Sequence, residues 1–356
     1  MKIVPPPGTV QANSLRLARR LLWFLRRNRE RLKHLLILTH DYPDPDALAS
    51  AFALQHLAHA AFDISARIAY CGELGRAENR MMVRLLRIRL HRMRKVWFKK
   101  YPCIALVDTQ PAFTNNAYPA NRHPVFIIDQ HTSEAPAQAD LALVDPDCGA
   151  TCVIMAQALL LRREPIPTRV ATALAYGILT DTLNLYRAKR ADVVEAYLRV
   201  LEQADMRTLA RIQNPTRPRR FFITLGRGIL QAVRFRRLLI THLGPVETPD
   251  LAAQVAEFLL VCRGISWSFV TGRHQGRLYA SLRTNKPDAQ AGEVLRAAFG
   301  HPHLAGGHGS IGGGSCPIDK NASEATWRKR EAELQARLLK RLRIAARTEP
   351  RYPFAG

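Results

Sequence analysis

The chain is organised around a short apolar stretch that ends in a cluster of ionisable side chains. Residues 35–38 are Leu-Leu-Ile-Leu, and His40, Asp44 and Asp46 follow before a helical pattern over residues 47–61. A continuous apolar run predicts a strand buried on both faces, as the strands of parallel sheets are. Ligands of open α/β sheets bind at the carboxyl ends of such strands. The stretch therefore predicts a parallel sheet with a polar site at one edge.

The three ionisable side chains favour a bound cation. One imidazole and two carboxylates in a single turn are costly to hold together unless a positive charge neutralises them. Carboxylates combined with imidazole suit Mn²⁺, Mg²⁺, Fe²⁺ or Zn²⁺. The simpler alternative is a polar loop in which Asp44 or Asp46 caps the following helix. Capping explains only one of the two acids and leaves His40 unexplained, so we predict metal ligation.

Later segments repeat the pattern of an apolar run that ends in an acid. Residues 103–107 lead to Asp108, residues 125–128 lead to Asp129, and the helical pattern over 169–180 ends at Asp181. Strands that alternate with helices predict a doubly wound, mostly parallel α/β sheet. Parallel strands share one carboxyl edge, so acids and imidazoles from distant segments should meet there: His40, Asp44, Asp46, Asp108, His131 and Asp181. Such a group can hold two divalent cations that activate water for attack on phosphorus.

The second half of the chain predicts a smaller α/β domain. Strands over residues 265–271 and 277–283, a helix over 291–299 and a glycine-rich loop over 305–315 follow one another there. We predict an active site in the cleft between the two domains. The expected divisions are a basic N-terminal helix (1–33), a catalytic domain (34–204), a connector (205–244), a substrate-binding domain (245–320) and a charged, solvated C-terminal helix with its tail (321–356).

The charge of the chain is unusual. It has 356 residues, of which 47% are hydrophobic and 23% charged, as in ordinary globular proteins, but the net charge is +24. Such a field attracts phosphate-bearing partners or anionic membranes. Residues 84–100 contain no acid, and because they include Val96-Trp97-Phe98, part of this segment should form a strand. This segment either binds single-stranded nucleic acid or is a solvated face. The basic helix over 14–34 either lies on a membrane or on nucleic acid, or packs on the sheet with a solvated basic face.

The remaining composition predicts a cytoplasmic protein. The six cysteines form no CxxC pair and no disulfide framework. The first residues, Met-Lys-Ile-Val-Pro-Pro-Pro, do not resemble a signal peptide, and no apolar run approaches the roughly 18 residues of a membrane span. The oligomeric state is not determined by these features, and an oligomer is compatible with them.

Four motifs together resemble those of the DHH phosphoesterases. Residues 40–47, His-Asp-Tyr-Pro-Asp-Pro-Asp-Ala, are similar to motif I of that family. Val107-Asp108-Thr109 resembles motif II, and Thr180-Asp181-Thr182 resembles motif IV. Gly306-Gly307-His308, preceded by Ser281-Leu282-Arg283-Thr284, resembles the DHH-associated C-terminal domain. The resemblance covers residues 34–316 in order.

The resemblance implies a role for each matching residue. It places one metal ion, Mn²⁺ in the family pattern, on His40, Asp44 and Asp108, and a second on Asp46, Asp108 and Asp181. It implies that His131, with Asp129 beside it, contacts and polarises the phosphate under attack. It implies that the second domain holds the rest of the substrate through Arg283, Gly306, Gly307 and His308.

One residue departs from the family pattern. The signature triplet reads Asp129-Gln130-His131, so Gln130 replaces the histidine that ligates the second metal ion. An amide oxygen is an uncharged donor that suits hard cations better than imidazole does. The second ion should therefore bind loosely, be a different ion or be absent.

We predict a working metal-dependent phosphodiesterase or phosphatase that acts on a small nucleotide or short oligonucleotide. The family resemblance implies short oligoribonucleotides, 3′-phosphoadenosine 5′-phosphate or linear dinucleotides as substrates, and single-strand exonuclease activity is a further option. Two alternatives remain open. One is a relative that binds nucleic acid with weakened catalysis, which Gln130 and the net charge favour. The other is a hydrolase of inorganic polyphosphate or pyrophosphate.

Overall fold

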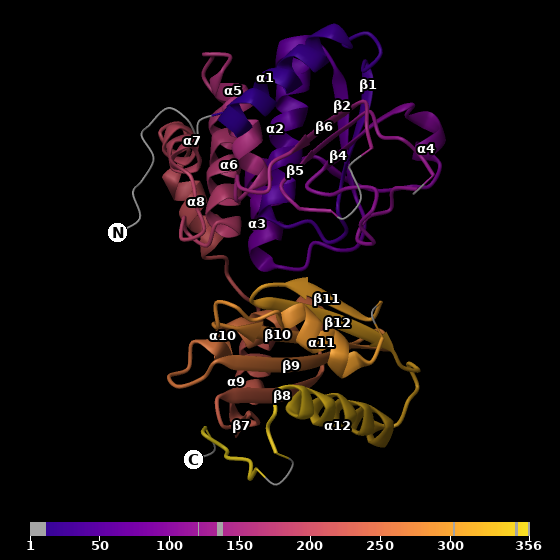
Figure 1. Ribbon diagram of the computed structural model, residues 1–356, viewed down its shortest axis with the longest axis vertical. Helices are drawn as coiled ribbons and strands as arrows, with labels where there is room; N and C mark the ends of the chain where they lie inside the picture. The colour runs from indigo at the N-terminus through magenta and orange to yellow at the C-terminus, as the bar shows by residue number, and fades with distance from the viewer. Residues whose placement is uncertain (1–11, 120, 134–137, 302, 346–347, 355–356) are drawn as a thin grey trace. The chain divides into compact units, whose positions relative to one another are not determined.

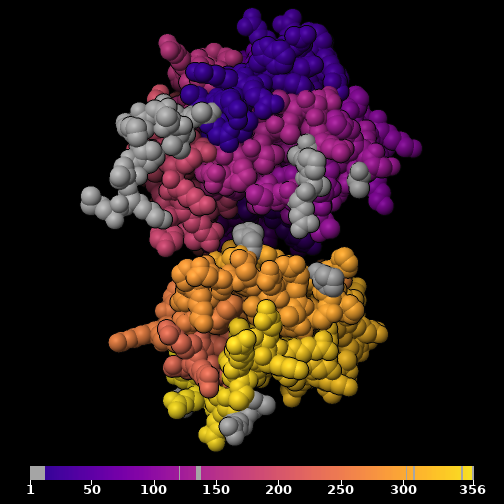
Figure 2. All heavy atoms as spheres, viewed as in Figure 1, coloured from indigo at the N-terminus to yellow at the C-terminus, as the bar shows by residue number. Residues whose placement is uncertain are grey.

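The computed structural model describes residues 12–119, 121–133, 138–301, 303–345 and 348–354. The chain divides into two compact units, Met1–Pro215 and Thr216–Gly356 (Figure 1). Each unit has its own six-stranded sheet and its own hydrophobic core. Figure 2 shows one face of the molecule with all heavy atoms drawn.

The sheet of the first unit is entirely parallel, and its strand order is β3-β2-β1-β4-β5-β6. The chain runs outward from β1 to β3 and then returns to place β4 beside β1. Ligands bind at such a reversal in doubly wound sheets. This arrangement confirms the predicted fold class. The strands are β1 (His34–Thr39), β2 (Ser65–Tyr70), β3 (Leu90–Arg92), β4 (Cys103–Val107), β5 (Phe126–Asp129) and β6 (Leu141–Val144).

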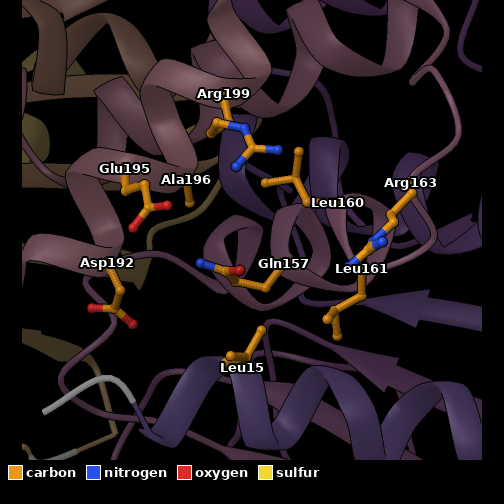
Figure 3. A pocket seen from close by; sticks show the side chains of 9 residues that line it. All are labelled: Leu15, Gln157, Leu160, Leu161, Arg163, Asp192, Glu195, Ala196 and Arg199. Carbon is orange, nitrogen blue, oxygen red and sulfur yellow. The ribbon is translucent and has the colours of Figure 1, made fainter. Parts of the chain in front are cut away.

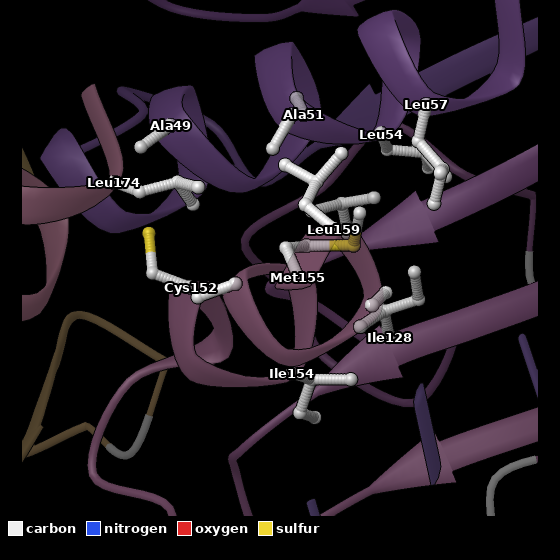
Figure 4. Close-up of a cluster of buried hydrophobic side chains, with 14 of the residues drawn as sticks. Ala49, Ala51, Leu54, Leu57, Ile128, Cys152, Ile154, Met155, Leu159 and Leu174 are labelled. Carbon is white, nitrogen blue, oxygen red and sulfur yellow. The ribbon is translucent and has the colours of Figure 1, made fainter. Parts of the chain in front are cut away.

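Helices cover one face of this sheet and build its main core. Figure 4 shows Leu54, Met155 and Ile128 filling the space between helices and sheet. Leu36, Leu38 and the other side chains of the opposite face pack against the segment that contains Trp97 and Phe98. The helices are α1 (Ala12–Arg27), α2 (Pro45–Phe62), α3 (Ala77–Leu86), α4 (Trp97–Lys100), α5 (Thr151–Leu160), α6 (Thr168–Asp181), α7 (Ala191–Leu201) and α8 (Met206–Gln213).

The basic N-terminal helix packs on the first unit. Leu17, Leu21 and Leu25 of α1 are buried in the main core, whereas its arginines, among them Arg19 and Arg26, face solvent. The hydroxyl of Ser14 donates to Asp145 at 2.8 Å and so ties the start of the helix to the end of β6. The helix ends at Arg27, several residues earlier than expected. No helix in the described part of the chain is long and apolar enough to span a membrane.

The second unit has a mixed sheet in the order β11-β12-β10-β9-β8-β7, in which only the β8–β9 pair is parallel. Separate hydrophobic clusters pack on its two faces. The strands are β7 (Val233–Phe235), β8 (Leu238–Pro245), β9 (Trp267–His274), β10 (Arg277–Thr284), β11 (Ala305–His308) and β12 (Ile311–Pro317). The helices are α9 (Arg219–Leu230), α10 (Asp250–Leu260), α11 (Ala291–Phe299) and α12 (Glu324–Arg341).

Several local expectations were wrong. The glycine-rich segment 305–315 is not a loop but the hairpin of β11 and β12, because its glycines allow close approach to neighbouring backbone. The strand expected within residues 84–100 does form, at β3, whereas Trp97 begins the short helix α4. Helix α12 is not fully solvated, because Trp327, Leu334 and Leu338 are buried and Glu331 pairs with buried Arg273.

Residues 205–244, expected as a connector, are shared between the two units. Helix α8 packs against α3 and α6 of the first unit, whereas α9, β7 and β8 belong to the second. The reason is the apolar content of these elements: Leu209 and Ile212 are buried in the first core, and Leu239 and Leu243 are buried in the second. The division between the units falls at Pro215.

Gly177 offers a test of the packing that holds α6 against α2 and α5. A Cβ atom there would lie 2.5 Å from Cys152 Sγ and 3.1 Å from Ala49 Cβ, and Figure 4 shows Ala49 and Cys152 at this junction. Gly177→Ala should therefore destabilise the first unit by about 1–3 kcal/mol through overpacking. Scanning calorimetry would record the loss as a lower unfolding midpoint.

Gly226→Ala is the matched control, because Gly226 is also helical and a Cβ atom there meets nothing within 4 Å. Alanine should stabilise α9 by about 0.5–1 kcal/mol through its better helix propensity. An equal response of the two glycines would contradict the packing argument.

Candidate active site

The predicted site residues of the first unit come together at the carboxyl edge of its sheet. His40 follows β1, Asp108 follows β4, Asp129 ends β5 and Asp181 ends α6. Asp108 has a φ of +58°, in the left-handed region, where aspartate is tolerated better than most residues. This conformation lies at the reversal in strand order. The local backbone strain thus occurs where the chain gathers its ionisable groups.

His40, Asp44 and Asp108 form the first group. Each can offer one ligand atom, and these atoms lie within 4.8 Å of one another. The Nε2 atom of His40 lies 3.5 Å from Asp108 Oδ2 and 3.8 Å from Asp44 Oδ1. The Nδ1 atom of the ring lies 2.8 Å from the carbonyl of Asp41, which fixes the orientation of the imidazole. Two carboxylates and one imidazole with a second hydrogen bond of this kind are a donor set suited to Mn²⁺ or a similar ion.

Asp44 also caps a helix. Its Oδ1 atom accepts the backbone N–H of Ala47 at 3.0 Å, at the start of α2. The capping alternative considered for the sequence is therefore true of Asp44, but it does not replace the contact with His40. Both roles draw on the same carboxylate.

Asp46 is fully engaged by the protein. It is buried, and its two oxygens accept the backbone N–H groups of Thr151 at 2.7 Å and of Cys152 at 2.8 Å. These N–H groups open helix α5, so the anion at this helix terminus is a side chain of the chain itself. The hydroxyl of Thr151 donates to Asp108 at 2.8 Å. One helix start thereby positions two of the predicted ligands.

His131 is held by Asp129. The Nδ1 atom lies 2.8 Å from Asp129 Oδ1, and it must carry the proton because an ionised carboxylate only accepts. Asp129 is buried and also accepts from the amide of Gln110 at 2.7 Å. The same amide donates to the carbonyl of His131 at 2.7 Å. Asp108, Asp129 and His131 form the second group whose potential ligand atoms lie within 4.8 Å of one another. Two of its members, Asp129 and His131, are already hydrogen-bonded to each other.

Gln130 lies between two acids. Its Nε2 atom donates to Asp46 Oδ2 at 3.2 Å and also to Asp181 Oδ2. Asp46 and Asp181 belong to neither group of three ligands found among the described residues. The residues expected to hold a second metal ion are thus close together, but an amide nitrogen faces their oxygens.

The electrostatics of the edge are dominated by like charges. Burial, together with repulsion from Asp108 and Asp181, raises the pKa of Asp46 well above its usual range. Burial and repulsion from Asp44 and Asp108 raise the pKa of Asp181 to about 7. A protonated acid is one answer to such repulsion, and a bound cation is another.

The pKa values of the two histidines are also raised, which for an imidazole favours the charged form. Burial opposes the charged form of His40, but its interactions with Asp108 and Asp44 outweigh burial and raise its pKa well above the usual value. Burial likewise opposes the charged form of His131, yet the hydrogen bond to Asp129 and the attraction of Asp108 raise its pKa to about 10. The edge therefore favours positive charge at each imidazole.

The predicted substrate residues of the second unit share one end of its sheet. Arg283 of β10 pairs with Ile311 of β12, which pairs in turn with His308 of β11. The side chain of His308 lies outside the described residues. Arg283 is largely buried, and its guanidinium donates to Glu257 at 3.3 Å and to the carbonyl of Gly312 at 3.1 Å.

The two glycines differ in what they require. Gly307 has a φ of +131°, and a Cβ atom there would lie 2.1 Å from the carbonyl oxygen of Ile311. Only glycine fits that position. A Cβ atom at Gly306 would meet nothing within 4 Å, so the backbone there is accessible to another molecule.

Sequence reasoning missed the residues that position the site rather than form it. Neither Thr151 nor Gln110 was among the predicted site residues. The partners of Gln110 lie far along the chain, because Asp129 ends β5 and the His131 carbonyl follows it. A glutamine directly after the Asp108 turn is the one signal that could have drawn attention to it.

A separate pocket of the first unit does not contain the site. Its volume is about 370 Å³, and Figure 3 shows its lining from α1, α5 and α7, which includes Gln157, Asp192, Glu195 and Arg199. Acids and arginines are mixed there, and Asp192 is already paired with Arg190 at 2.8 Å. The chemistry of the chain is therefore better sought at the acidic sheet edge.

Comparison with known proteins agrees with this geometry. Residues 34–178 match the DHH family, N-terminal domain. They form a DHH domain. The match includes motifs I and II and the Asp129-Gln130-His131 triplet, and it ends just before Asp181.

A curated relative and two solved structures extend the likeness. An uncharacterized protein of Methanocaldococcus jannaschii is 33% identical over 291 residues, which are 81% of this chain and 59% of the relative's length. An exopolyphosphatase-related protein from Bacteroides fragilis has a TM-score of 0.72 at 14% identity, with 94% of this chain and 100% of that chain covered. RecJ of Thermus thermophilus in complex with Mn²⁺ has a TM-score of 0.52 at 19% identity, with 94% of this chain and 56% of that chain covered. At these identities the two structures show a shared fold.

The hydroxyl of Thr151 offers a test of how the DHH domain positions its acids. Thr151→Val removes the 2.8 Å hydrogen bond to Asp108 and keeps the side-chain shape. Loss of such a supporting hydrogen bond typically costs ten- to a hundredfold in metal affinity, and we expect a weakening of Mn²⁺ binding in that range by calorimetric titration.

Thr241→Val in the second unit is the control. The Thr241 hydroxyl is buried and has no hydrogen-bond partner among the described residues, so its loss should leave Mn²⁺ affinity unchanged. Equal affinities of the Thr151 variant and the parent protein would contradict the positioning role.

Proposed function

We propose that the DHH domain is a divalent-metal-dependent phosphoesterase that hydrolyses a phosphoester of a small nucleotide or a short oligonucleotide. The observation that carries the proposal is the group His40, Asp44 and Asp108, in which three ligand atoms from two separate segments lie within 4.8 Å. Its carboxylate and imidazole donors suit Mn²⁺, and the Mn²⁺-bound RecJ structure of the same fold supports that choice.

A divalent ion held by these residues supplies a Lewis acid for the phosphoryl oxygens and a water of lowered pKa. The other residues act on the substrate directly. Because Nδ1 of His131 donates to Asp129, the Nε2 side of the half-exposed ring is left to donate to a phosphate oxygen. The charge of the imidazolium favours the developing negative charge on the phosphate. Asp129 acts through His131 by holding its ring and its proton.

We assign substrate binding in the second unit to Arg283, Gly306, Gly307 and His308. The open backbone of Gly306 and the row formed by Arg283, Ile311 and His308 support this assignment. The contacts of Arg283 with Glu257 and Gly312 fix the direction of its guanidinium. Three further statements stay predictions: that this unit is the DHH-associated domain, that the active site lies in a cleft between the two domains, and that the protein is cytoplasmic.

The basic segment 84–100 favours a substrate that carries several phosphate groups, as an oligonucleotide does. Arg94, Lys95, Lys99 and Lys100 are exposed there. Its aromatic rings are already engaged, because the Arg67 guanidinium lies 5.2 Å from the ring centre of Trp97 and Phe98 packs edge-on against Tyr118 at 6.1 Å. The segment therefore acts through charge on the phosphate backbone rather than through stacking on bases.

The decisive test is turnover by the purified chain and by its Asp108→Ala variant. Each is incubated with Mn²⁺, Mg²⁺ or Zn²⁺ and a panel of linear dinucleotides, 3′-phosphoadenosine 5′-phosphate, short oligoribonucleotides, polyphosphate and pyrophosphate. We expect metal-dependent release of a nucleotide product by the parent, and a loss of more than about a hundredfold in the variant because a metal ligand is removed.

Asp147→Ala is the matched control, since the Asp147 side chain is largely exposed, and it should hydrolyse like the parent. A fully active Asp108 variant would refute the site. Tight binding of single strands without any product would favour the binding protein of weakened catalysis, and turnover of polyphosphate or pyrophosphate alone would refute the nucleotide substrate.

Charge reversal tests the role of the basic segment. Arg94→Glu, Lys95→Glu and Lys99→Glu combined should weaken binding of single-stranded oligonucleotides of any sequence. The slope of log affinity against log salt should become shallower by about 0.7 for each phosphate group that the segment no longer neutralises. Fluorescence anisotropy at several salt concentrations measures both quantities.

The control carries the same change in net charge elsewhere. Lys329, Lys340 and Arg341 are exposed on α12, and their replacement by glutamate should change the slope less. If the two triple variants respond equally, net charge rather than this segment governs binding.

A further inference from the structure

We propose that the amide of Gln130 takes the place of a second metal ion, so that this DHH domain binds a single divalent cation at His40, Asp44 and Asp108. The inference rests on the proposed metal-dependent function and makes it more specific. It starts from a disagreement: the family pattern implies two ions, but the residues of the second position do not fit an ion as they do at the first.

Hydrogen-bond donors of the chain surround the carboxylate of Asp46. Its Oδ1 atom accepts from the backbone of Cys152 at 2.8 Å and from the hydroxyl of Ser50 at 3.3 Å. Its Oδ2 atom accepts from the backbone of Thr151 at 2.7 Å and from Gln130 at 3.2 Å. A carboxylate has about four lone-pair sites, so hydrogen-bond donors of the chain take up its accepting capacity. Two of these donors are fixed main-chain groups at a helix start.

The Gln130 amide lies between the carboxylates of Asp46 and Asp181. The NH₂ group has two hydrogens, and one Nε2 atom faces both Asp46 and Asp181. It therefore bridges the two carboxylates that the family pattern assigns to the second ion together with Asp108. A histidine at this position would offer an acceptor nitrogen to a cation, whereas the amide nitrogen offers only donors. For its oxygen to ligate an ion, the amide would have to turn and give up both hydrogen bonds.

The first position differs from this arrangement. There the Nε2 atom of His40 lies 3.5 Å and 3.8 Å from its two carboxylate oxygens. These distances exceed those of ordinary N–H···O hydrogen bonds, so the groups face one another without closing. Three ionisable ligands converge at this position, and the second position has an uncharged donor at its centre.

Metal counting tests the inference without reference to activity. The purified chain, saturated with Mn²⁺ and freed of loose ions by equilibrium dialysis, should hold about one ion per chain by elemental analysis. Its electron paramagnetic resonance spectrum should show the hyperfine pattern of an isolated Mn²⁺ ion. Gln130→His should raise the count about twofold and produce the spectrum of two exchange-coupled ions.

Two control variants locate the second ion. Gln130→His combined with Asp181→Asn should return the count to about one, because the added histidine then lacks its carboxylate partner. Gln213→His places a histidine on an exposed position of α8 and should not change the count. An increase in that variant would show that histidine recruits Mn²⁺ wherever it is placed, and would overturn the inference.

The outcomes separate the inference from the proposed function. Two ions on the parent chain overturn the inference and leave a metal-dependent phosphoesterase intact. A single ion on both the parent and Gln130→His shows that Gln130 is not what excludes the second ion, which also overturns the inference. No bound ion on the parent overturns the proposed function itself. One ion on the parent and a coupled pair on Gln130→His support both.

Discussion

The attachment of Asp46 to the start of helix α5 is the interaction on which the first unit depends. The Asp46 carboxylate belongs to α2 and accepts the first backbone N–H groups of α5, those of Thr151 and Cys152. These groups have no partners within their own helix, so the contact satisfies buried polar groups on both sides. It also fixes α2 and α5 relative to each other at the point where β1 and β4 end. Because both helices are fixed there, Asp46 of α2 and Asp108, which accepts from Thr151 of α5, cannot separate to relieve their repulsion.

The close packing behind this edge follows from the same constraint. Helix α6 ends at the sheet edge with Asp181 as its last residue. It packs against α2 and α5 so closely that neighbouring atoms leave no room for a side chain at Gly177. Small residues such as Ala49 line the junction. A wider spacing would move Asp181 away from Asp46. Core packing and the arrangement of the acids therefore depend on each other, and a change in either disturbs the other.

The parts of this arrangement that could be predicted from the sequence are those that follow from local periodicity. Apolar runs that end in an acid predicted β1, β4 and β5, and the shared carboxyl edge of parallel strands then brought His40, Asp44 and Asp108 together. Contacts between side chains of distant segments have no such local signal. The donation of Gln110 to Asp129 and the hydroxyl of Thr151 on Asp108 are of this kind. Glycine led to the wrong prediction for residues 305–315, because it is typical of loops, yet here it permits two strands to pass close to neighbouring backbone.

Gln130 shows why a departure from a motif must be interpreted with its neighbours. Taken alone, glutamine in place of histidine is a weaker ligand, and a site with a weaker ligand would be a damaged version of a two-metal site. In the structure its amide donates to the two carboxylates that most need a positive neighbour, Asp46 and Asp181. Hydrogen-bond donors stabilise carboxylates as a cation does, although with partial charges in place of full ones. A substitution that removes a ligand can therefore also remove the need for the ion, and the first position keeps its own ligands unchanged.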